Sequence, residues 1–420
     1  MERFERNGVG CVFDFGSSSL RYGYAEDSAP WLCELSCRGT LRKCMSSASG
    51  YVMLGGHCAS DVVGNAAQQH RGILSLDYPV KRGLIQNWES FEKLLEHCIL
   101  YLHILPRDEP LTFCHSPYHP PASNNRLCEV VFEKLGTTAL KLGTHAELAA
   151  LATGRETALI VDLGAGRTTV SPFYSGYLLK PSIRHINFGG ADILEYLARL
   201  VVNETGYSVT TSSEREILQL ILRDMCYVSQ ERPLHSGNDT QAPTWADSPL
   251  PYSETQAFEL PDGNTLCLGD ALKQSPEVVF NPALLGREIE TCPSTPAKHC
   301  SSGIANPLER LQAKASPRAS LGDELPNELW EQVRSKVHHH NAKRINIVED
   351  PRLQQFASWT GGAIFASMSE HYEHMPILRS EYEEQGPSCW RKYSAFASPF
   401  SSPTKTLQQP CIFIFVHSSN

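Results

Sequence analysis

The chain has 420 residues, of which 41% are hydrophobic and 20% charged, a composition typical of a folded protein rather than a disordered or collagen-like one. Its 46 acidic residues outnumber its 37 basic ones, and the formal net charge of -9 disfavours a direct grip on a nucleic-acid backbone. No run approaches the roughly 20 apolar residues that a membrane-spanning helix needs, so we expect neither nucleic acid nor a membrane as a direct partner.

The N-terminal residues, Met1 to Asn7, are rich in charge and lack the apolar core and the cleavage site of a secretory signal. We therefore expect an intracellular protein in which the 14 cysteines are mainly buried thiols. One group is dense enough to be considered as a metal site. It consists of Cys33, Cys37, Cys44 and Cys58.

Residues 10–24 place strand-like apolar residues on both sides of a Gly/Ser-rich turn, which predicts a β-hairpin. Its first strand ends in Asp14, and the turn follows at Gly16. Residues 158–170 repeat this pattern, because an apolar strand again ends in an aspartate, Asp162, before small residues and another strand. Two separated copies predict a duplicated α/β architecture.

Helices are expected at residues 87–102 and 191–202, where apolar residues recur at helical spacing. A further helix is predicted from a capping box of Ser213 and Glu216 through Tyr227.

The stretches 230–255 and 291–327 are rich in proline and polar residues and predict irregular structure. The tail from Ser394 ends in an apolar run, Cys411 to Val416. Two interpretations of this run stay open: a strand added to a partner or to its own sheet, or an exposed aggregation-prone segment.

A Gly/Ser turn between strands can aim consecutive backbone N–H groups into one concavity that suits phosphate oxygens, and an aspartate at the strand end can hold a hydrated divalent cation. Arg21, in the second strand of the first hairpin, adds guanidinium donors for phosphate. The same spacing also fits two ordinary hairpins with an aspartate near the turn, so the pattern alone leaves both interpretations open.

Several short stretches carry a more specific signal, and they occur in a fixed order. They are residues 14–17, 71–88, 152–155, 162–166, 174–177, 189–192, 206–208, 213–217, 260–263, 359–362 and 381–388. In these stretches and in their order, residues 10 to 393 resemble the actin family.

The resemblance implies the α/β, two-lobed actin-like ATPase fold, with duplicated ribonuclease-H-like domains around a central nucleotide cleft. It implies a division into a first lobe, a second lobe, an outer subdomain on each, and an extra tail. The first-lobe core is residues 1–31, 79–152 and 353–393, its outer subdomain 32–78, the second-lobe core 153–188 and 279–352, its outer subdomain 189–278, and the tail 394–420.

The resemblance also implies ATP with Mg²⁺ or Ca²⁺ as the cofactor. Asp14 and Asp162 would hold the metal through water, and Arg21 replaces the family's lysine. The residues implied to bind the nucleotide are Asp14, Gly16, Ser17, Ser18, Arg21, Asp162, Gly164, Gly166, Thr168, Gly190 and Gly303.

The sequence departs from the family where ATP is hydrolysed. His145 stands where the family has the glutamine that orients the attacking water, Ala165 where it has a second cleft aspartate, and Thr169 where it has a water-contacting histidine. Because hydrolysis needs a positioned water and a stabilised phosphoryl group, we expect at most a weak ATPase. The alternative that His145 itself orients water, as a catalytic residue, stays open.

The adenine side differs from the family as well. Gln219 and the Leu222-Arg223 pair replace nucleotide-contacting residues, the segment 288–300 is short, and residues 301–307 are all that remains of the loops over the base. Nucleotide binding and a purely structural cleft are therefore both compatible with the sequence.

The resemblance favours a structural subunit of a cytoskeletal assembly in the cytoplasm, with other proteins, among them actin or actin-related proteins, as partners. An alternative is a nuclear subunit of a chromatin-remodelling complex. A third class, an active phosphotransferase such as a sugar kinase or an Hsp70-like ATPase, is disfavoured because residues 78–88 and 177–184 resemble actin and not those relatives. Polymerisation like that of conventional actin is not expected, because residues 30–59 and the irregular residues 291–327 do not resemble its filament-contact surfaces.

Overall fold

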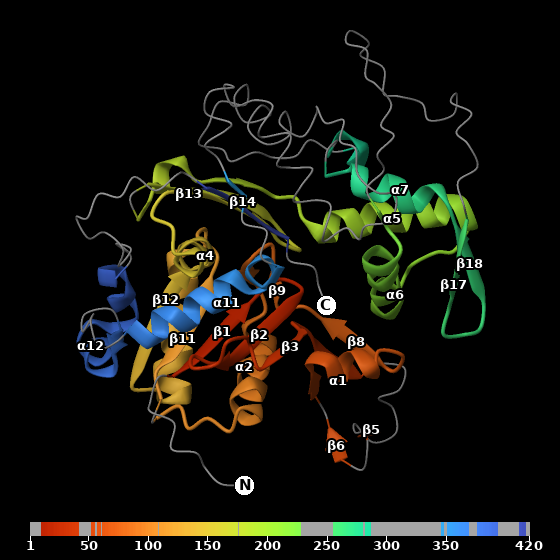
Figure 1. Cartoon of the computed structure of the whole chain (residues 1–420). Coiled ribbons are helices and arrows are strands. Elements are labelled where there is room, and N and C mark those ends of the chain that lie inside the picture. The colour runs from red at the N-terminus through yellow and green to blue at the C-terminus, as the bar shows by residue number, and fades with distance from the viewer. Residues whose placement is uncertain are drawn as a thin grey trace, which may run out of the picture. The chain divides into compact units, whose positions relative to one another are not determined.

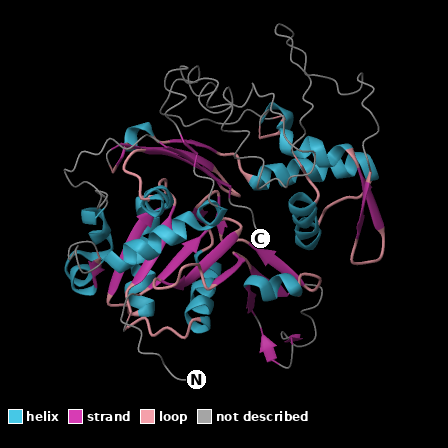
Figure 2. Ribbon diagram, in the orientation of Figure 1, coloured by secondary structure: helices cyan, strands magenta, loops and turns pink. Residues whose placement is uncertain are grey.

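The computed structural model describes residues 10–41, 52–54, 57–59, 61–107, 109–174, 176–227, 255–279, 282–286, 346–347, 351–368, 376–393 and 411–416 (Figures 1 and 2). The chain forms two compact units, one of residues 1–190 with 343–420 and one of residues 191–342. The finer division into lobe cores and outer subdomains stays a prediction.

The first unit contains a six-stranded sheet built around the predicted N-terminal hairpin. Strand β1 (Cys11–Phe15) pairs antiparallel with β2 (Ser19–Tyr24) and parallel with β11 (Leu111–His115). The sheet continues on one side through β12 (Ala139–Thr144) to β20 (Ile377–Leu378), and on the other to β3 (Leu32–Leu35). This confirms the hairpin and places Asp14 opposite Arg21 in the ladder.

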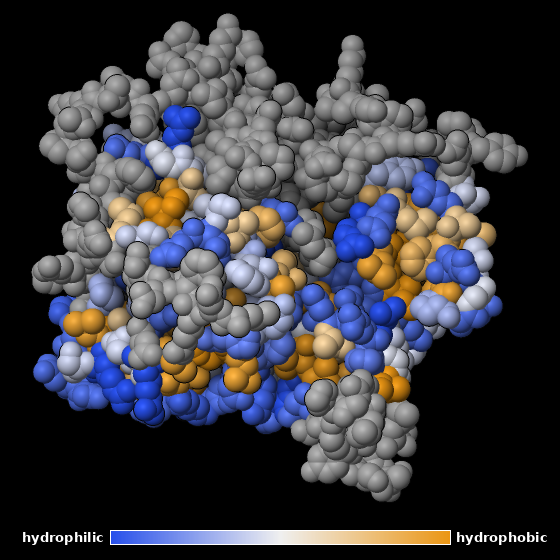
Figure 3. Space-filling model, turned by 60° about the horizontal axis from the view of Figure 1, so that its bottom comes forward, coloured by the Kyte–Doolittle hydropathy of each residue, from blue (hydrophilic) through white to orange (hydrophobic). Residues whose placement is uncertain are grey.

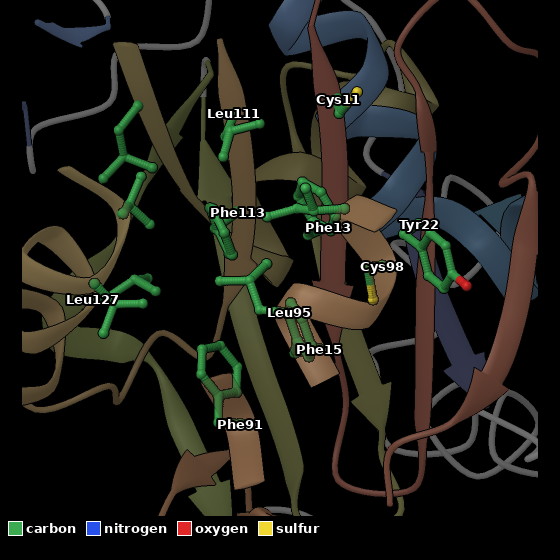
Figure 4. Packing of buried hydrophobic residues seen from close by; sticks show 14 of the residues in the cluster. Cys11, Phe13, Phe15, Tyr22, Phe91, Leu95, Cys98, Leu111, Phe113 and Leu127 are labelled. Atoms are coloured by element: carbon green, nitrogen blue, oxygen red, sulfur yellow. The ribbon is translucent and has the colours of Figure 1, made fainter. Parts of the chain in front are cut away.

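An aromatic core packs under this sheet (Figure 4). The ring centroids of Phe13 and Phe113 are 5.2 Å apart, and those of Phe15 and Phe91 are 4.6 Å apart. Phe91 belongs to helix α2 (Trp88–Tyr101), which confirms the helix predicted at 87–102. Its first and last predicted residues are the caps, and the Asn87 side chain accepts the Ser90 N–H.

A second sheet is built around the second predicted hairpin, β13 (Ala158–Leu163) and β14 (Thr168–Tyr174). Both β15 (Tyr177–Leu178) and β16 (Arg184–Ile186) pair with β14. On the other side, β13 pairs in parallel with β21 (Cys411–Val416), which also pairs in parallel with β19 (Asn346–Ile347). The apolar run of the tail is therefore a strand of the protein's own sheet.

The two sheets repeat one arrangement, as the duplicated pattern predicted. Strand β1 lies between an antiparallel neighbour, β2, and a parallel neighbour, β11, and β13 lies in the same way between β14 and β21. The strand order along the chain differs, because β11 precedes β12 whereas β21 follows β19. The tail of the chain thus supplies the strand at the position that β11 has in the first sheet.

Helices α4 (His145–Thr153) and α11 (Pro351–Ser367) form a layer between the two sheets. Leu148 packs with Val12 of the first sheet, whereas Ala149 packs with Ile160 of the second. The helices approach closely at Gly361, where an added Cβ atom would lie 1.8 Å from the Leu148 carbonyl oxygen. This layer fixes the position of His145 at the start of α4.

Smaller elements complete the first unit. One three-stranded sheet is ordered β7-β4-β8, with helix α1 beside it, and two hairpins are formed by β5 with β6 and by β9 with β10. The bounds are β4 (Arg38–Leu41), β5 (Val52–Leu54), β6 (His57–Ala59), β7 (Asp61–Val63), α1 (Gly64–Gln69), β8 (Leu74–Asp77), β9 (Val80–Lys81), β10 (Leu84–Ile85), α3 (Pro121–Glu129), a π-helical turn (Val130–Leu135), α12 (Arg379–Gln385) and 3₁₀ segments Lys180–Ser182 and Gly386–Tyr393.

The described part of the second unit contains three helices packed with a hairpin around their own apolar core. The elements are α5 (Gly190–Thr205), α6 (Ser212–Asp224), β17 (Gln256–Glu259), β18 (Thr265–Leu268), α7 (Asp270–Glu277) and the 3₁₀ segment Pro282–Leu285. Helix α5 confirms the helix predicted at 191–202 and extends beyond it.

The predicted cap of α6 was wrong by two residues. Thr211 is the N-cap and forms the capping box with Glu214, whereas Glu216 lies inside the helix and is buried. Thr211 stands three residues before a glutamate, as Ser213 of the predicted pair does, and the helix is capped by the earlier pair, Thr211 and Glu214. Glu216 faces inward instead.

Several predictions fall outside the described residues: the irregular stretches at 230–254 and 291–327, the short segment 288–300, residues 301–307, and Cys44. Among the described residues, Cys33 and Cys37 form no disulfide bond, and no group of His, Cys, Asp and Glu could hold a metal. In the described part of the chain, no helix is both long and apolar enough to cross a membrane.

Candidate functional site

A pocket opens where the turns of the two hairpins approach each other, entirely within the first unit. Its empty volume is about 590 Å³, part of which is open to solvent. The lining residues come from both hairpins, from the β9–β10 turn, from the segment after β11 and from the start of α4. They are Asp14, Phe15, Gly16, Ser17, Ser18, Ser19, Arg21, Gly83, Ser116, Pro117, His145, Asp162, Gly164, Ala165, Gly166, Arg167 and Thr169.

The two hairpin turns have matching backbone geometry. The Gly16 N–H donates to the Ser19 carbonyl at 2.9 Å, and the Gly164 N–H donates to the Arg167 carbonyl at 3.0 Å. An added Cβ atom would lie 2.8 Å from the Ser19 oxygen at Gly16 and 3.0 Å from the Arg167 oxygen at Gly164. Both turns therefore favour glycine at the same point, because a side chain there would press on the carbonyl that closes the turn.

A third turn joins the two hairpins. Between β9 and β10, Arg82 and Gly83 both have positive φ angles, 51° and 71°, as in a type I′ turn. The Gly83 N–H donates to the Ser17 hydroxyl at 2.9 Å, and the Arg82 guanidinium donates to the Gly166 carbonyl at 3.0 Å. This turn therefore bonds to one residue of each hairpin turn and holds their spacing.

Asp14 is almost completely buried, with 2% of its surface exposed, and both of its carboxylate oxygens have a neighbour. Oδ2 lies 3.3 Å from Nη1 of Arg21, and Oδ1 lies 3.0 Å from Nε2 of His145. Arg21 is itself 2% exposed. The first aspartate is thus enclosed by a guanidinium and an imidazole.

His145 is held by its own helix and by α11. It is the first residue of α4, whose N-cap Thr144 accepts the Glu147 N–H and completes a capping box. Burial opposes protonation of the imidazole, but its close contact with Asp14 and the charge of that carboxylate outweigh burial and raise the pKa of His145. The imidazole is therefore positioned as a partner of Asp14.

Asp162 has different surroundings. The residue opposite it in the β13–β14 ladder is the uncharged Thr169, and Ala165 in the turn contributes no carboxylate. The guanidinium of Arg167 donates to the Asn187 side chain at 3.2 Å and lies over the Tyr118 ring. The second aspartate therefore has no cationic residue across its own ladder.

The structure brings most of the predicted nucleotide residues together. Asp14, Gly16, Ser17, Ser18, Arg21, Asp162, Gly164 and Gly166 all line the pocket, and so does His145, the predicted catalytic residue. Two others lie behind the second turn, where the Thr168 hydroxyl donates to the Phe188 carbonyl and the Gly190 N–H donates to the Gly164 carbonyl. Gly303 lies outside the described residues. That these residues bind nucleotide stays a prediction.

Sequence reasoning missed the lining residues Ser116, Pro117 and Arg167, and it gave no role to Arg82 and Gly83. A signal for the last two was available in the Arg-Gly pair between two short apolar stretches, but type I′ turns favour Asn-Gly or Asp-Gly more strongly. The adenine-side positions Gln219, Leu222 and Arg223 lie on α6, in the other unit.

The pocket fits phosphate oxygens better than it fits a divalent cation at Asp14. The two glycine turns and their serines offer the kind of backbone concavity that binds anions. A cation prefers carboxylate oxygens, yet those of Asp14 already contact Arg21 and His145. Among the described lining residues, Asp162 is the one other acidic residue.

The comparison with protein families agrees with this architecture. A family model described as Actin matches residues 8–395, which include both hairpins, α4, α11 and every residue that lines the pocket. The tail strand β21 lies beyond the matched residues. Because the match covers most of the chain and the structure is a mixed α/β fold with two corresponding sheets, the chain belongs to the actin family.

Proposed function

We propose that this protein binds a nucleotide by its phosphate groups in the pocket between the two hairpin turns and hydrolyses it weakly or not at all. The nucleotide, ATP in the first place, then serves as a structural ligand. The observation that carries the proposal is the 3.0 Å contact between His145 and Asp14 in a pocket built from two glycine turns.

Weak hydrolysis follows from what His145 contacts. Attack on a phosphoryl group requires a water held in line by a suitably placed acceptor. In this chain the Nε2 atom of the residue at that position contacts Asp14, and Ala165 and Thr169 supply neither a carboxylate nor an imidazole on the opposite hairpin. The pocket therefore keeps phosphate-binding turns without a group placed to activate water, which argues against a catalytic role for His145.

The binding part of this proposal is tested by saturation with a labelled ATP analogue. Gly166→Val should abolish binding, because even a Cβ atom at Gly166 would lie 2.7 Å from the Arg82 Cα and 2.8 Å from the Ser17 oxygen. The control is Gly72→Ala, since an added Cβ there meets nothing within 4 Å. If the wild-type protein shows no saturable binding at millimolar nucleotide, the cleft is purely structural and the proposal is wrong.

We further propose that the protein is a structural subunit of a cytoskeletal assembly in the cytoplasm, with other proteins, including actin or actin-related proteins, as its partners. Membership of the actin family supports this, and so does the net charge of -9, which disfavours nucleic acid as the partner. Among the residues that Figure 3 draws in colour, apolar residues form several patches between hydrophilic ones.

Localisation and co-purification of the tagged protein test the assembly. We expect cytoskeletal proteins in the purified complex and a cytoplasmic signal. A chromatin-remodelling ATPase in the complex, together with a nuclear signal, would overturn the cytoskeletal proposal and favour a nuclear role.

A further inference from the structure

We infer that the pocket binds the phosphate groups of its ligand without a divalent cation. In place of a cation, the Arg21 guanidinium and the His145 imidazole contact the two carboxylate oxygens of the first aspartate. This inference rests on the proposed nucleotide pocket, and it concerns which charges meet the phosphates there.

Both carboxylate oxygens of Asp14 already contact a neighbouring side chain. Its two oxygens lie 3.3 Å from the Arg21 guanidinium and 3.0 Å from the His145 imidazole, and aspartate and arginine are each 2% exposed. A cation that used Asp14, directly or through water, would have to displace one of these neighbours or lie beside a buried positive charge. At such distances in a buried site, repulsion between like charges is strong.

The charged side chains that line the pocket balance one another. Of the described residues that line the pocket, Arg21 and Arg167 are cationic, and Asp14 and Asp162 are anionic. The formal charges of these four side chains cancel. The protein therefore needs no bound cation to balance its own carboxylates, and an entering phosphate group does not meet an excess of negative charge.

The guanidinium of Arg21 is the cationic group of the first hairpin that lines the pocket. The Nε atom of Arg21 is buried and has no hydrogen-bond partner among the described residues, although Arg21 lines the pocket. A buried guanidinium N–H without an acceptor costs free energy, and a phosphate oxygen is an acceptor that guanidinium groups bind well. Together with the serine-rich first turn, the Arg21 guanidinium places a positive charge beside an anion on the first hairpin.

The second hairpin offers a cation one carboxylate, that of Asp162. Asp162 faces the uncharged Thr169 across its ladder, and Ala165 adds no second carboxylate to that turn. One carboxylate on this side is a weak basis for holding a hydrated cation, because calcium and magnesium sites usually combine several oxygen ligands. Neither hairpin alone offers the cation a favourable site.

The test measures the Kd of the full-length protein for ATP, by calorimetry, in excess Mg²⁺ and again in excess EDTA. We expect the two values to agree within about threefold, which is less than 0.7 kcal/mol at about 1.4 kcal/mol per tenfold change. Binding that is lost in EDTA but present with Mg²⁺ would overturn the inference and leave the nucleotide pocket intact. Absence of binding under both conditions would instead overturn the proposed function itself.

The variant His145→Gln tests the assignment to these residues. Removing the imidazole frees Oδ1 of Asp14, so the affinity for ATP should become dependent on Mg²⁺ by at least about tenfold. The matched control is His70→Gln, because His70 lies at the end of α1 and does not line the pocket; it should behave as wild type. A folded His145→Gln variant that remains indifferent to Mg²⁺ would overturn the role of His145, and the wild-type comparison stands even where the variant fails to fold.

Discussion

The two hairpins that form the pocket share a backbone turn but differ in what faces their aspartates. Each turn is closed by a glycine N–H that donates to a carbonyl three residues later, at 2.9 Å from Gly16 and at 3.0 Å from Gly164. Asp14 faces Arg21 across its ladder and contacts His145 as well, whereas Asp162 faces Thr169. The shape of each turn is thus set by its glycine, whereas the charge around its aspartate is set by the residues that face the aspartate.

The hairpins also differ in how they are supported. On its parallel side the first hairpin has β11, a strand from the first third of the chain, whereas the second has β21 from the tail. Strand β21 lies beyond the residues that the family model matches. The second hairpin, which lines one side of the pocket, therefore pairs with a segment that lies outside the residues matched by the family model.

The largest expected effect comes from removing the charge partner of the first hairpin. Arg21→Met removes the guanidinium that contacts the buried Asp14. Because breaking a buried ion pair leaves an uncompensated charge, the free energy of unfolding should fall by about 3 kcal/mol. Thr169→Val, at the matching position of the second hairpin, should cost less, about 1 kcal/mol. Equilibrium urea unfolding measures both. Equal losses for the two variants would show that the hairpins do not differ in charge as described.

Interrupting the tail strand should separate the two hairpins in stability. Ile414→Pro places a proline in the middle of β21, at the residue that is paired with Val161 of β13, at a cost of about 2 kcal/mol. Hydrogen exchange should show lost protection in β13 and retained protection in β1. Ser419→Pro, beyond the strand, is the control and should change neither. Unchanged protection of β13 would contradict the pairing with β21.

Alanine at the two turn glycines probes the feature that the hairpins share. Gly16→Ala should lower stability by about 1–2 kcal/mol, because its Cβ atom would lie 2.8 Å from a backbone oxygen, and Gly164→Ala somewhat less, because the distance there is 3.0 Å. Both should weaken binding of ATP, and Gly72→Ala should not. A turn that accepts alanine without loss of binding would not be a phosphate-binding turn.

The smallest effect is expected at the turn that joins the hairpins. Arg82→Gly relieves a positive φ of 51°, worth about 1 kcal/mol, but removes the hydrogen bonds to the Gly166 and Asn187 carbonyls, worth about 1 kcal/mol each. Stability should therefore fall by no more than about 1 kcal/mol, while the affinity for ATP falls because the spacing of the turns is less restrained. Thermal unfolding and calorimetry separate the two. A large loss of stability with unchanged affinity would assign Arg82 a purely structural role.

The parts of the fold that were predictable are local. Both hairpins and α2 follow from alternating or helical spacing next to turn and cap residues, and these signals act within a few neighbours. Even the misplaced cap of α6 was off by two residues, because Thr211 and Ser213 offer the same spacing to a glutamate.

The parts that could not be predicted depend on residues distant in sequence. No local pattern pairs His145 with Asp14 or places Cys411–Val416 beside Ala158–Leu163, because both follow from how α4 and the two sheets pack. The resemblance supplied His145 as a candidate, but its contact with a buried carboxylate came from the structure.

The measurement that tests the central claim most directly is the identity of the nucleotide held by the wild-type protein after prolonged incubation with ATP, determined by denaturing the isolated complex and separating the released nucleotides. We predict that the protein retains a stoichiometric amount of nucleotide and that it is recovered as ATP. Recovery of the bound nucleotide as ADP, at a rate comparable to that of a polymerising actin, would contradict the conclusion that His145 is tied to Asp14 and does not activate water.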